Sequence, residues 1–149
     1  MTDPSETSER PIVLPIPGSQ RDAATVATDG SPRLPEIDGV RFRPAVRHGD
    51  HRGVLTEVFS SNWGDGYGAV PHVYDVVALP GSLRAWIVHL EQDDRLFFID
   101  GIARIGLYDA RPESPTHGVG SILYLGGHRP GLLEIPSGVY HGVRNVGDT

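Results

Sequence analysis

From Gly39 onward, the chain consists of short runs of alternating apolar and polar residues separated by glycine and proline. Successive side chains of a strand point to opposite faces, so this two-residue period is typical of strands with one buried face. No segment shows a sustained helical period over the length of a helix. The pattern predicts strands over residues 40–43, 54–59, 74–79, 83–90, 96–99, 102–108, 122–125, 132–135 and 139–146.

These strands predict an all-β fold. Eight or so short strands in roughly 110 residues, at regular spacing, are typical of an antiparallel sandwich or barrel of the jelly-roll type. Asp100-Gly101 lies between the runs 96–99 and 102–108, and Asp-Gly is a strong hairpin turn sequence. We therefore expect these two runs to pair with each other. The sequence shows no internal repeat.

The first 38 residues differ from the rest of the chain. They contain six prolines and many Ser, Thr and Asp residues, and the prolines around Ile12, Leu14 and Ile16 remove backbone donors that a central strand needs. We expect residues 1–38 to form a disordered tail without a packed role. Residues 39–149 are then the folded domain.

Composition and charge exclude several functions. The chain has 149 residues and a formal net charge of −6, which argues against a nucleic-acid surface. It contains neither Cys nor Lys, so thiolate chemistry, Cys-ligated zinc and a Schiff base within the chain are excluded. It also shows no apolar run long enough to span a membrane and no secretory signal, so we expect a cytoplasmic protein.

The most specific motif is residues 136–145, which fit P-x-G-x-x-H-x-x-x-N. This motif resembles the second motif of the cupin superfamily, in which the histidine points from a strand into a small jelly-roll barrel. The first cupin motif is matched only in part, by residues 81–101. His89 stands at its second histidine, Ile87 replaces the first, and Asp93 or Asp94 replaces its glutamate.

A narrower resemblance rests on four ordered blocks. Residues 50–59 resemble D-x-R-G-x-F-x-E-x-F of the dTDP-4-dehydrorhamnose 3,5-epimerases, 114–118 their S-P-T-F-G, and 135–142 their I-P-x-G-F-x-H-G. Residues 84–94 are similar to R-A-W-H-x-H-x-x-Q-D-D of a divergent branch. The resemblance covers roughly residues 40–149 and implies a cupin-type jelly roll.

What the resemblance implies is a site for a dTDP-4-keto-6-deoxy sugar, whose keto group acidifies the protons on C3 and C5. It implies no cofactor and a homodimer in which strands near the N-terminus extend the partner's sheet. Arginine suits bidentate contact with a diphosphate. The candidate substrate-binding residues are Arg52, Glu57, His72, Arg84 and His141.

The family's catalytic groups are not matched. Its base falls on Ile87, which cannot accept a proton, and its lysine falls on Asp94, whose charge would repel an enolate. Its tyrosine and one or more strands lie beyond Thr149, so either the chain lacks its C-terminal strands or a neighbouring chain completes the barrel. The remaining candidates for a catalytic base are His89 and His141.

Three functional hypotheses follow. The first is a sugar-nucleotide epimerase with an altered catalytic site. The second is a binding module that keeps the arginines but has lost the chemistry. The third is a metal-binding cupin in which His89, His141 and Asp93 or Asp94 supply two imidazoles and a carboxylate. The first hypothesis does not use a metal.

Overall fold

The computed structural model describes residues 24–31, 33, 36–64, 67 and 70–148. The chain divides into two compact units, Met1–Arg33 and Leu34–Thr149, and every strand named below belongs to the second. Most of the predicted disordered tail lies outside the described residues.

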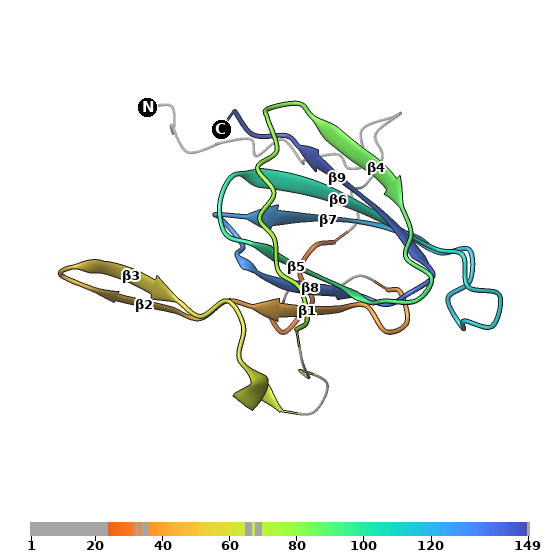
Figure 1. The fold of residues 1–149 in the computed structure, drawn as a ribbon, viewed down its shortest axis with the longest axis horizontal. Coiled ribbons are helices and arrows are strands. Elements are labelled where there is room, and N and C mark those ends of the chain that lie inside the picture. The colour runs from red at the N-terminus through yellow and green to blue at the C-terminus, as the bar shows by residue number, and fades with distance from the viewer. Residues whose placement is uncertain (1–23, 32, 34–35, 65–66, 68–69, 149) are drawn as a thin grey trace, which may run out of the picture. The chain divides into compact units, whose positions relative to one another are not determined.

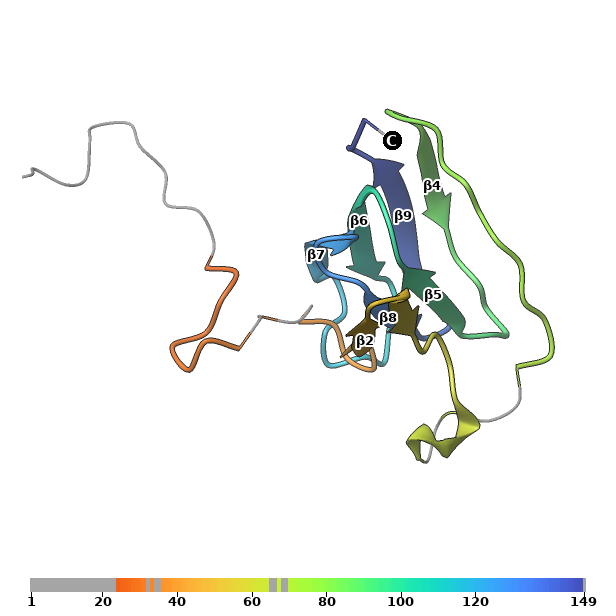
Figure 2. The same cartoon turned by 90° about the vertical axis from the view of Figure 1, so that its left-hand side faces the viewer.

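Two antiparallel sheets form the domain (Figures 1 and 2). One sheet has the order β1-β8-β5, formed by Arg41–Pro44, Gly131–Ile135 and Asp94–Phe98. The other has the order β4-β9-β6-β7, formed by Leu83–Ile87, Val139–Asn145, Ile102–Asp109 and Gly120–Gly126. A separate hairpin joins β2 (Arg47–Asp50) to β3 (Gly53–Thr56), and a 3₁₀ turn, η1, covers Ser61–Trp63. Among the described residues, no helix has the length and apolar composition needed to cross a membrane.

The core lies between the facing sides of the two sheets. Buried positions alternate along β6, where Ile105 and Leu107 point inward, and these residues belong to one apolar cluster with Leu133 and Ile135 of β8. Burial of such side chains is the main force that holds two sheets together. The predicted all-β jelly-roll sandwich is confirmed.

The predicted hairpin at Asp100-Gly101 is wrong. The turn exists, with Gly101 at a φ of 64°, but it carries the chain from one sheet to the other. β5 pairs with β8, whereas β6 pairs with β7 and β9. The local sequence determines where the chain turns, but the partner of each strand is decided by packing between distant segments.

The strand predicted over 74–79 is also wrong, because this segment has no ladder partner in the described chain and leaves Val77 80 % exposed. Conversely, β2 was not predicted, since all four of its residues are exposed and carry no apolar pattern. The packed chain begins slightly before Gly39: Ile37 is 3 % exposed and belongs to the core.

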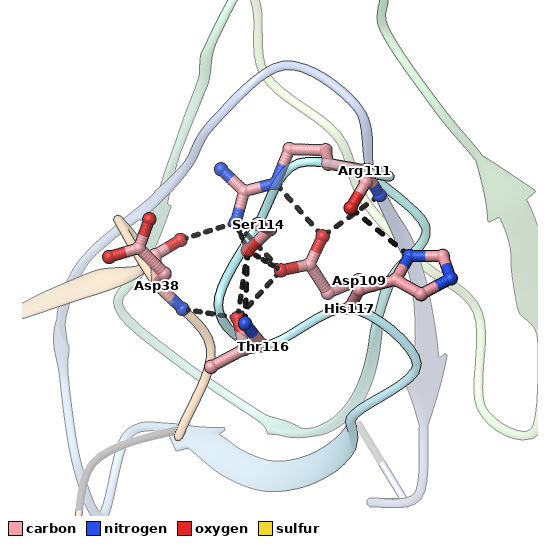
Figure 3. A network of polar contacts seen from close by, with 6 residues as sticks. All are labelled: Asp38, Asp109, Arg111, Ser114, Thr116 and His117. Carbon is pink, nitrogen blue, oxygen red and sulfur yellow. Dashed lines mark hydrogen bonds and ion pairs between the residues drawn. The ribbon is translucent and has the colours of Figure 1, made fainter.

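A buried polar network fastens this entry segment to the loop after β6 (Figure 3). Asp109, the last residue of β6, is fully buried and accepts hydrogen bonds from Arg111, Ser114 and Thr116. Arg111 also donates to the backbone carbonyl of Asp38, and the Asp38 N–H donates to Thr116 Oγ1. The Ser-Pro-Thr motif therefore serves a structural purpose: its hydroxyl groups satisfy a buried carboxylate.

The Arg111 guanidinium, hydrogen-bonded to Asp109, holds the pKa of the Asp109 carboxyl far below its ordinary value, although burial acts in the opposite direction. The hydroxyls of Ser114 and Thr116 add to the lowering. A carboxyl with a depressed folded-state pKa stabilises the fold above its unfolded-state pKa, and this contribution is lost as the pH falls toward the folded-state value.

We predict that Asp109→Asn lowers the free energy of unfolding by about 3 kcal/mol near neutral pH, because Arg111 then lacks its buried counter-charge. The difference between wild type and variant should shrink as the pH falls below the ordinary carboxyl range of about 4. Urea unfolding at neutral and acid pH measures both effects. Asp50→Asn removes the carboxylate of an exposed Asp–Arg pair and should leave stability unchanged; a pH-independent difference at Asp109 would contradict the prediction.

Candidate functional site

His141 lies in the middle of β9 and faces the space between the sheets. It is flanked in register by Ile87 of β4 and Leu107 of β6, and it is 4 % exposed. Residues two apart in a strand share a face, so His141 points the same way as the core residue Val139. The prediction that this histidine points into the barrel agrees with this placement.

Asp94 reaches the same interior from the other sheet. It is the first residue of β5 and pairs in register with Ile135 of β8, which is fully buried. Register partners project from the same face of a sheet, so the Asp94 carboxylate enters the sandwich at its edge. Its side chain is 14 % exposed.

A tight turn over residues 136–138 positions His89, the third member of this group of side chains. The Gly138 N–H donates to the backbone carbonyl of His89 at 2.8 Å, and the Ser137 N–H donates to the Asp93 side chain at 2.9 Å. These two hydrogen bonds thus hold the segment between β4 and β5 against the start of β9, the strand that carries His141. The expected placement of His89 on the strand is wrong, because β4 ends at Ile87.

His89, Asp94 and His141 converge on one point. Asp94 Oδ2 lies 3.3 Å from His89 Nε2 and 3.1 Å from His141 Nε2, and the two imidazole centroids are 6.0 Å apart. A ring nitrogen of each histidine and a carboxylate oxygen of Asp94 all lie within 4.8 Å of one another. His141 Nδ1 lies 3.5 Å from the Val139 carbonyl oxygen. This cluster is suited to proton transfer or to binding a cation.

An irregularity in β4 determines the face of the sheet on which Arg84 lies. Arg84 pairs with Val143 and Ile87 pairs with His141, so three residues of β4 advance while β9 advances by two. One extra residue is the signature of a β-bulge, and it lets Arg84 and Ile87 share the inward face of the sheet. Ile87, at the family's base position, therefore borders His141 with an aliphatic side chain.

The other substrate-binding candidates lie elsewhere in the structure. Arg52 is in the turn of the β2–β3 hairpin, which stands out from the sheets in Figure 1, and forms an ion pair with Asp50. Glu57 accepts a hydrogen bond from Trp63 Nε1 at 2.7 Å. His72 is exposed and contacts the Tyr74 ring. Of the three candidate histidines, His89 and His141 therefore lie in the cluster with Asp94, and His72 does not.

Sequence reasoning missed the part that Asp94 plays. The motif alignment assigns Asp94 to a lysine position whose role it cannot fill, whereas the structure shows one of its oxygens between two imidazoles. The spacing gives a partial indication, because Asp94 is one of the two acids that the motif offers as metal ligands. Asp93 instead binds the turn through Ser137.

Two curated relatives resemble most of the chain, while no family model matches it. The probable low-salt glycan biosynthesis epimerase of Haloferax volcanii is 38 % identical over 117 residues, which cover 77 % of this chain and 74 % of the relative. The spore coat polysaccharide biosynthesis protein SpsL of Bacillus subtilis is 35 % identical over 124 residues, covering 76 % and 74 %. This chain belongs to the cupin-fold sugar epimerase family that includes the dTDP-4-dehydrorhamnose 3,5-epimerases.

Solved structures of the epimerase family share the fold. A dTDP sugar isomerase from Desulfovibrio desulfuricans G20 superposes with a TM-score of 0.71 at 24 % identity, covering 76 % of this chain and 72 % of that one. An epimerase from Legionella pneumophila in complex with dTDP-4-keto-L-rhamnose gives a TM-score of 0.64 at 23 % identity, covering 76 % and 64 %. The fold expected from the four sequence blocks is thus found in this family.

We predict that Gly138→Ala disrupts the turn that holds His89. Gly138 has a φ of 80°, and an added Cβ would lie 2.6 Å from Arg111 Cγ. Backbone strain and this contact should together lower the free energy of unfolding by about 2–3 kcal/mol. Gly81→Ala is the matched control, because Gly81 has a φ of 74° but open space around its Cβ position.

Urea unfolding separates the two contributions. The Gly81→Ala control should lower the free energy of unfolding by about 1 kcal/mol, because it introduces backbone strain alone. Equal losses in the two variants would show that contact with Arg111 does not constrain the turn.

Proposed function

We propose that this protein is a sugar-nucleotide epimerase that acts on a dTDP-4-keto-6-deoxy sugar through an altered catalytic site. The observation that carries the proposal is the pairing of Asp94 with two histidines beside the aliphatic Ile87. Support also comes from the relative named as a glycan biosynthesis epimerase and from the Legionella neighbour bound to a dTDP-4-keto sugar. Epimerisation requires only that a base remove a proton next to the keto group and that a proton return from the other face.

Of the two histidines, His89 is the stronger candidate for the base. Its Nε2 faces Asp94, and its side chain is 37 % exposed, so part of the side chain is accessible to a substrate. His141 is almost fully buried and has a polar neighbour at each ring nitrogen. A carboxylate that accepts the Nε2–H bond fixes the tautomer with a lone pair on Nδ1, as the aspartate of a catalytic triad does for its histidine.

Asp94 then positions the base. The lysine of the related epimerases supplies positive charge to an enolate, which a carboxylate cannot do. Arg84 shares the inward face with Ile87, and its guanidinium carries the positive charge that a diphosphate or an enolate requires. We therefore assign Arg84 to substrate binding, His89 to proton abstraction and Asp94 to orientation of His89.

Solvent deuterium exchange into a dTDP-4-keto-6-deoxy sugar tests this assignment. The unmodified protein should incorporate deuterium at C3 or C5, and His89→Gln should slow incorporation by about 10²- to 10⁴-fold, the usual contribution of a general base. Asp94→Asn should slow it as well, while substrate affinity changes little. His128→Gln alters an exposed histidine in the turn between β7 and β8 and should have no effect.

Two different results would contradict the assignment of His89 as the base or the proposal of an active enzyme. Unchanged exchange in His89→Gln together with slow exchange in His141→Gln would move the base to His141. Tight binding of the nucleotide sugar without exchange by the unmodified protein would leave a binding module that has lost its chemistry.

Arg84 should bind the diphosphate or the sugar. Loss of one charge-assisted contact costs roughly 1.5–3 kcal/mol, so Arg84→Ala should weaken dTDP binding by about 10- to 150-fold in calorimetric titration. Arg84→Lys should recover part of the affinity, because one ammonium group cannot replace the planar fork of a guanidinium. Arg104→Ala, a change at an exposed arginine of β6, is the control. Unchanged affinity in Arg84→Ala would exclude this role.

We further propose that the protein is a homodimer. Val54 and Leu55 of the β2–β3 hairpin are 65 % and 64 % exposed, and the hairpin pairs with neither sheet. A second copy would cover these apolar side chains and bring Arg52 against a neighbouring chain. Light scattering at tens of micromolar should give twice the chain mass, and Leu55→Glu should yield monomers while Ile122→Glu on β7 does not. A monomeric unmodified protein would contradict the proposal.

A further inference from the structure

We infer that the outer face of the sheet formed by β4, β9, β6 and β7 binds an acidic polysaccharide. This face is turned away from the core and from the cluster of His89, Asp94 and His141, so the inference goes beyond the proposed function. We call it the outer aromatic face. Its exposed side chains are aromatic, aliphatic or basic: Leu83 and Trp86 on β4, Tyr140 and Arg144 on β9, Ile102, Arg104 and Tyr108 on β6, and Ile122 and Tyr124 on β7.

Alternation and register place these residues on one side of the sheet. Buried and exposed positions alternate along β6, so Arg104 and Tyr108 point away from the core. Tyr108 pairs with Tyr140, and Arg104 pairs with both Arg144 and Tyr124. Residues that stand opposite each other project from the same face of a sheet. Neighbouring strands lie about 4.8 Å apart, so the face is roughly 14 Å wide and accommodates several linked sugar rings.

Trp86 provides a flat surface near the centre of the outer aromatic face. A Cβ atom added to Gly106 would lie 3.1 Å from Trp86 Cη2 and 3.6 Å from Cζ3, so the indole reaches from β4 across β9 to β6. Trp86 is nevertheless 61 % exposed. The C–H groups of a pyranose ring carry partial positive charge and pack against the negative face of an aromatic ring. Trp86 is therefore a stacking platform for a sugar, and Tyr108 stands two residues along β6 from Gly106.

Arg104 and Arg144 give the outer aromatic face its charge. The two arginines stand opposite each other on β6 and β9, and like charges in that position destabilise a sheet. Within the described part of the chain, neither guanidinium forms an ion pair or a hydrogen bond, and the face contains no acidic side chain. The Cβ atoms of opposed residues lie about 5 Å apart, so one carboxylate can contact both guanidinium groups. Such an anion would replace their repulsion by charge-assisted hydrogen bonds.

Charge and shape favour the polysaccharide over three other occupants. A second copy docked through the same face would bring no acid to the two arginines. A nucleic acid carries a phosphate at every nucleotide, and a chain with a net charge of −6 repels a polyphosphate. Tryptophan anchors of protein interfaces fill pockets of the partner, whereas Trp86 lies against its own sheet. A polysaccharide of alternating acidic and neutral sugars supplies one carboxylate to the arginines and uncharged rings to the aromatic side chains.

Calorimetric titration of the full-length protein with a hyaluronan octasaccharide tests the inference, because this probe alternates a uronic acid with a neutral N-acetylated sugar. The unmodified protein should bind it saturably. Arg104→Gln should weaken binding by about 10- to 150-fold, the usual effect of losing one charge-assisted contact. Arg47→Gln alters an exposed arginine of β2, outside this sheet, and should leave the affinity unchanged.

An N-acetylchitooligosaccharide separates the effect of charge from that of stacking. This neutral probe offers sugar rings without a carboxylate, so it should bind the unmodified protein more weakly than hyaluronan does. Its affinity should be the same for Arg104→Gln and for the unmodified protein, because the arginine then has no anionic group to contact. A loss of affinity for both probes in Arg104→Gln would contradict the carboxylate contact.

Tryptophan fluorescence locates the bound sugar on the protein. The chain has two tryptophans, and Trp63 lies in η1, outside the outer aromatic face. Hyaluronan should change the emission of Trp63→Phe, in which Trp86 is the remaining tryptophan, and should leave the emission of Trp86→Phe unchanged. Phenylalanine keeps an aromatic ring at either position, and circular dichroism verifies that both variants fold. The opposite pattern would place the sugar elsewhere and overturn the inference.

Further results would also overturn it. These are no saturable binding of hyaluronan by the unmodified protein, equal affinity in Arg104→Gln, tighter binding of a single-stranded oligothymidylate, or displacement of hyaluronan by dTDP, which would move the sugar to the inner site. Loss of self-association in Arg104→Gln, measured by light scattering, would assign the face to a second copy of the chain. No nucleotide sugar is present in the hyaluronan titrations, so failure of the proposed epimerase activity leaves their result unaffected.

Discussion

The site depends on two backbone hydrogen bonds from one turn. The N–H groups of Ser137 and Gly138 hold Asp93 and His89, and the strand that begins directly after them carries His141. Asp93 directly precedes Asp94, so the same turn fixes the approach to all three side chains of the cluster. A shift of about one ångström in this turn would separate the imidazoles from their shared carboxylate.

The turn itself rests on the buried charges at the end of β6. The aliphatic part of Arg111 lies against Gly138, where even a methyl group would collide with it, while its guanidinium is held by Asp109. Asp109 is fully buried and bound by the hydroxyls of the Ser-Pro-Thr loop. A sequence block far from the cluster thus stabilises it through one arginine, and this link accounts for the cost we expect at Gly138.

The sequence predicted the architecture and part of the site. The alternating run 102–108 and the largely apolar run 132–135 predict core strands, and both contribute inward residues to a buried layer. The run 74–79 misled, since β propensity cannot supply a partner strand, and Asp100-Gly101 misled because the pairing depends on distant segments. Motif spacing selects His89 and His141 as candidates, and the structure brings the two side chains together. The bridging position of Asp94 does not follow from motif spacing, because it depends on how the edge of one sheet meets the middle of the other.

The exposed segment 73–79 has a consequence for handling the protein. It is rich in β-branched residues, it contains no proline, and Val73 and Val77 are each 80 % exposed, which is the composition of segments that nucleate cross-β stacking. Asp75 interrupts the run with a charge and Pro80 closes it with a residue that lacks a backbone donor. These two residues act as gatekeepers. We therefore expect that neutralising Asp75 would make concentrated solutions of the protein aggregate sooner.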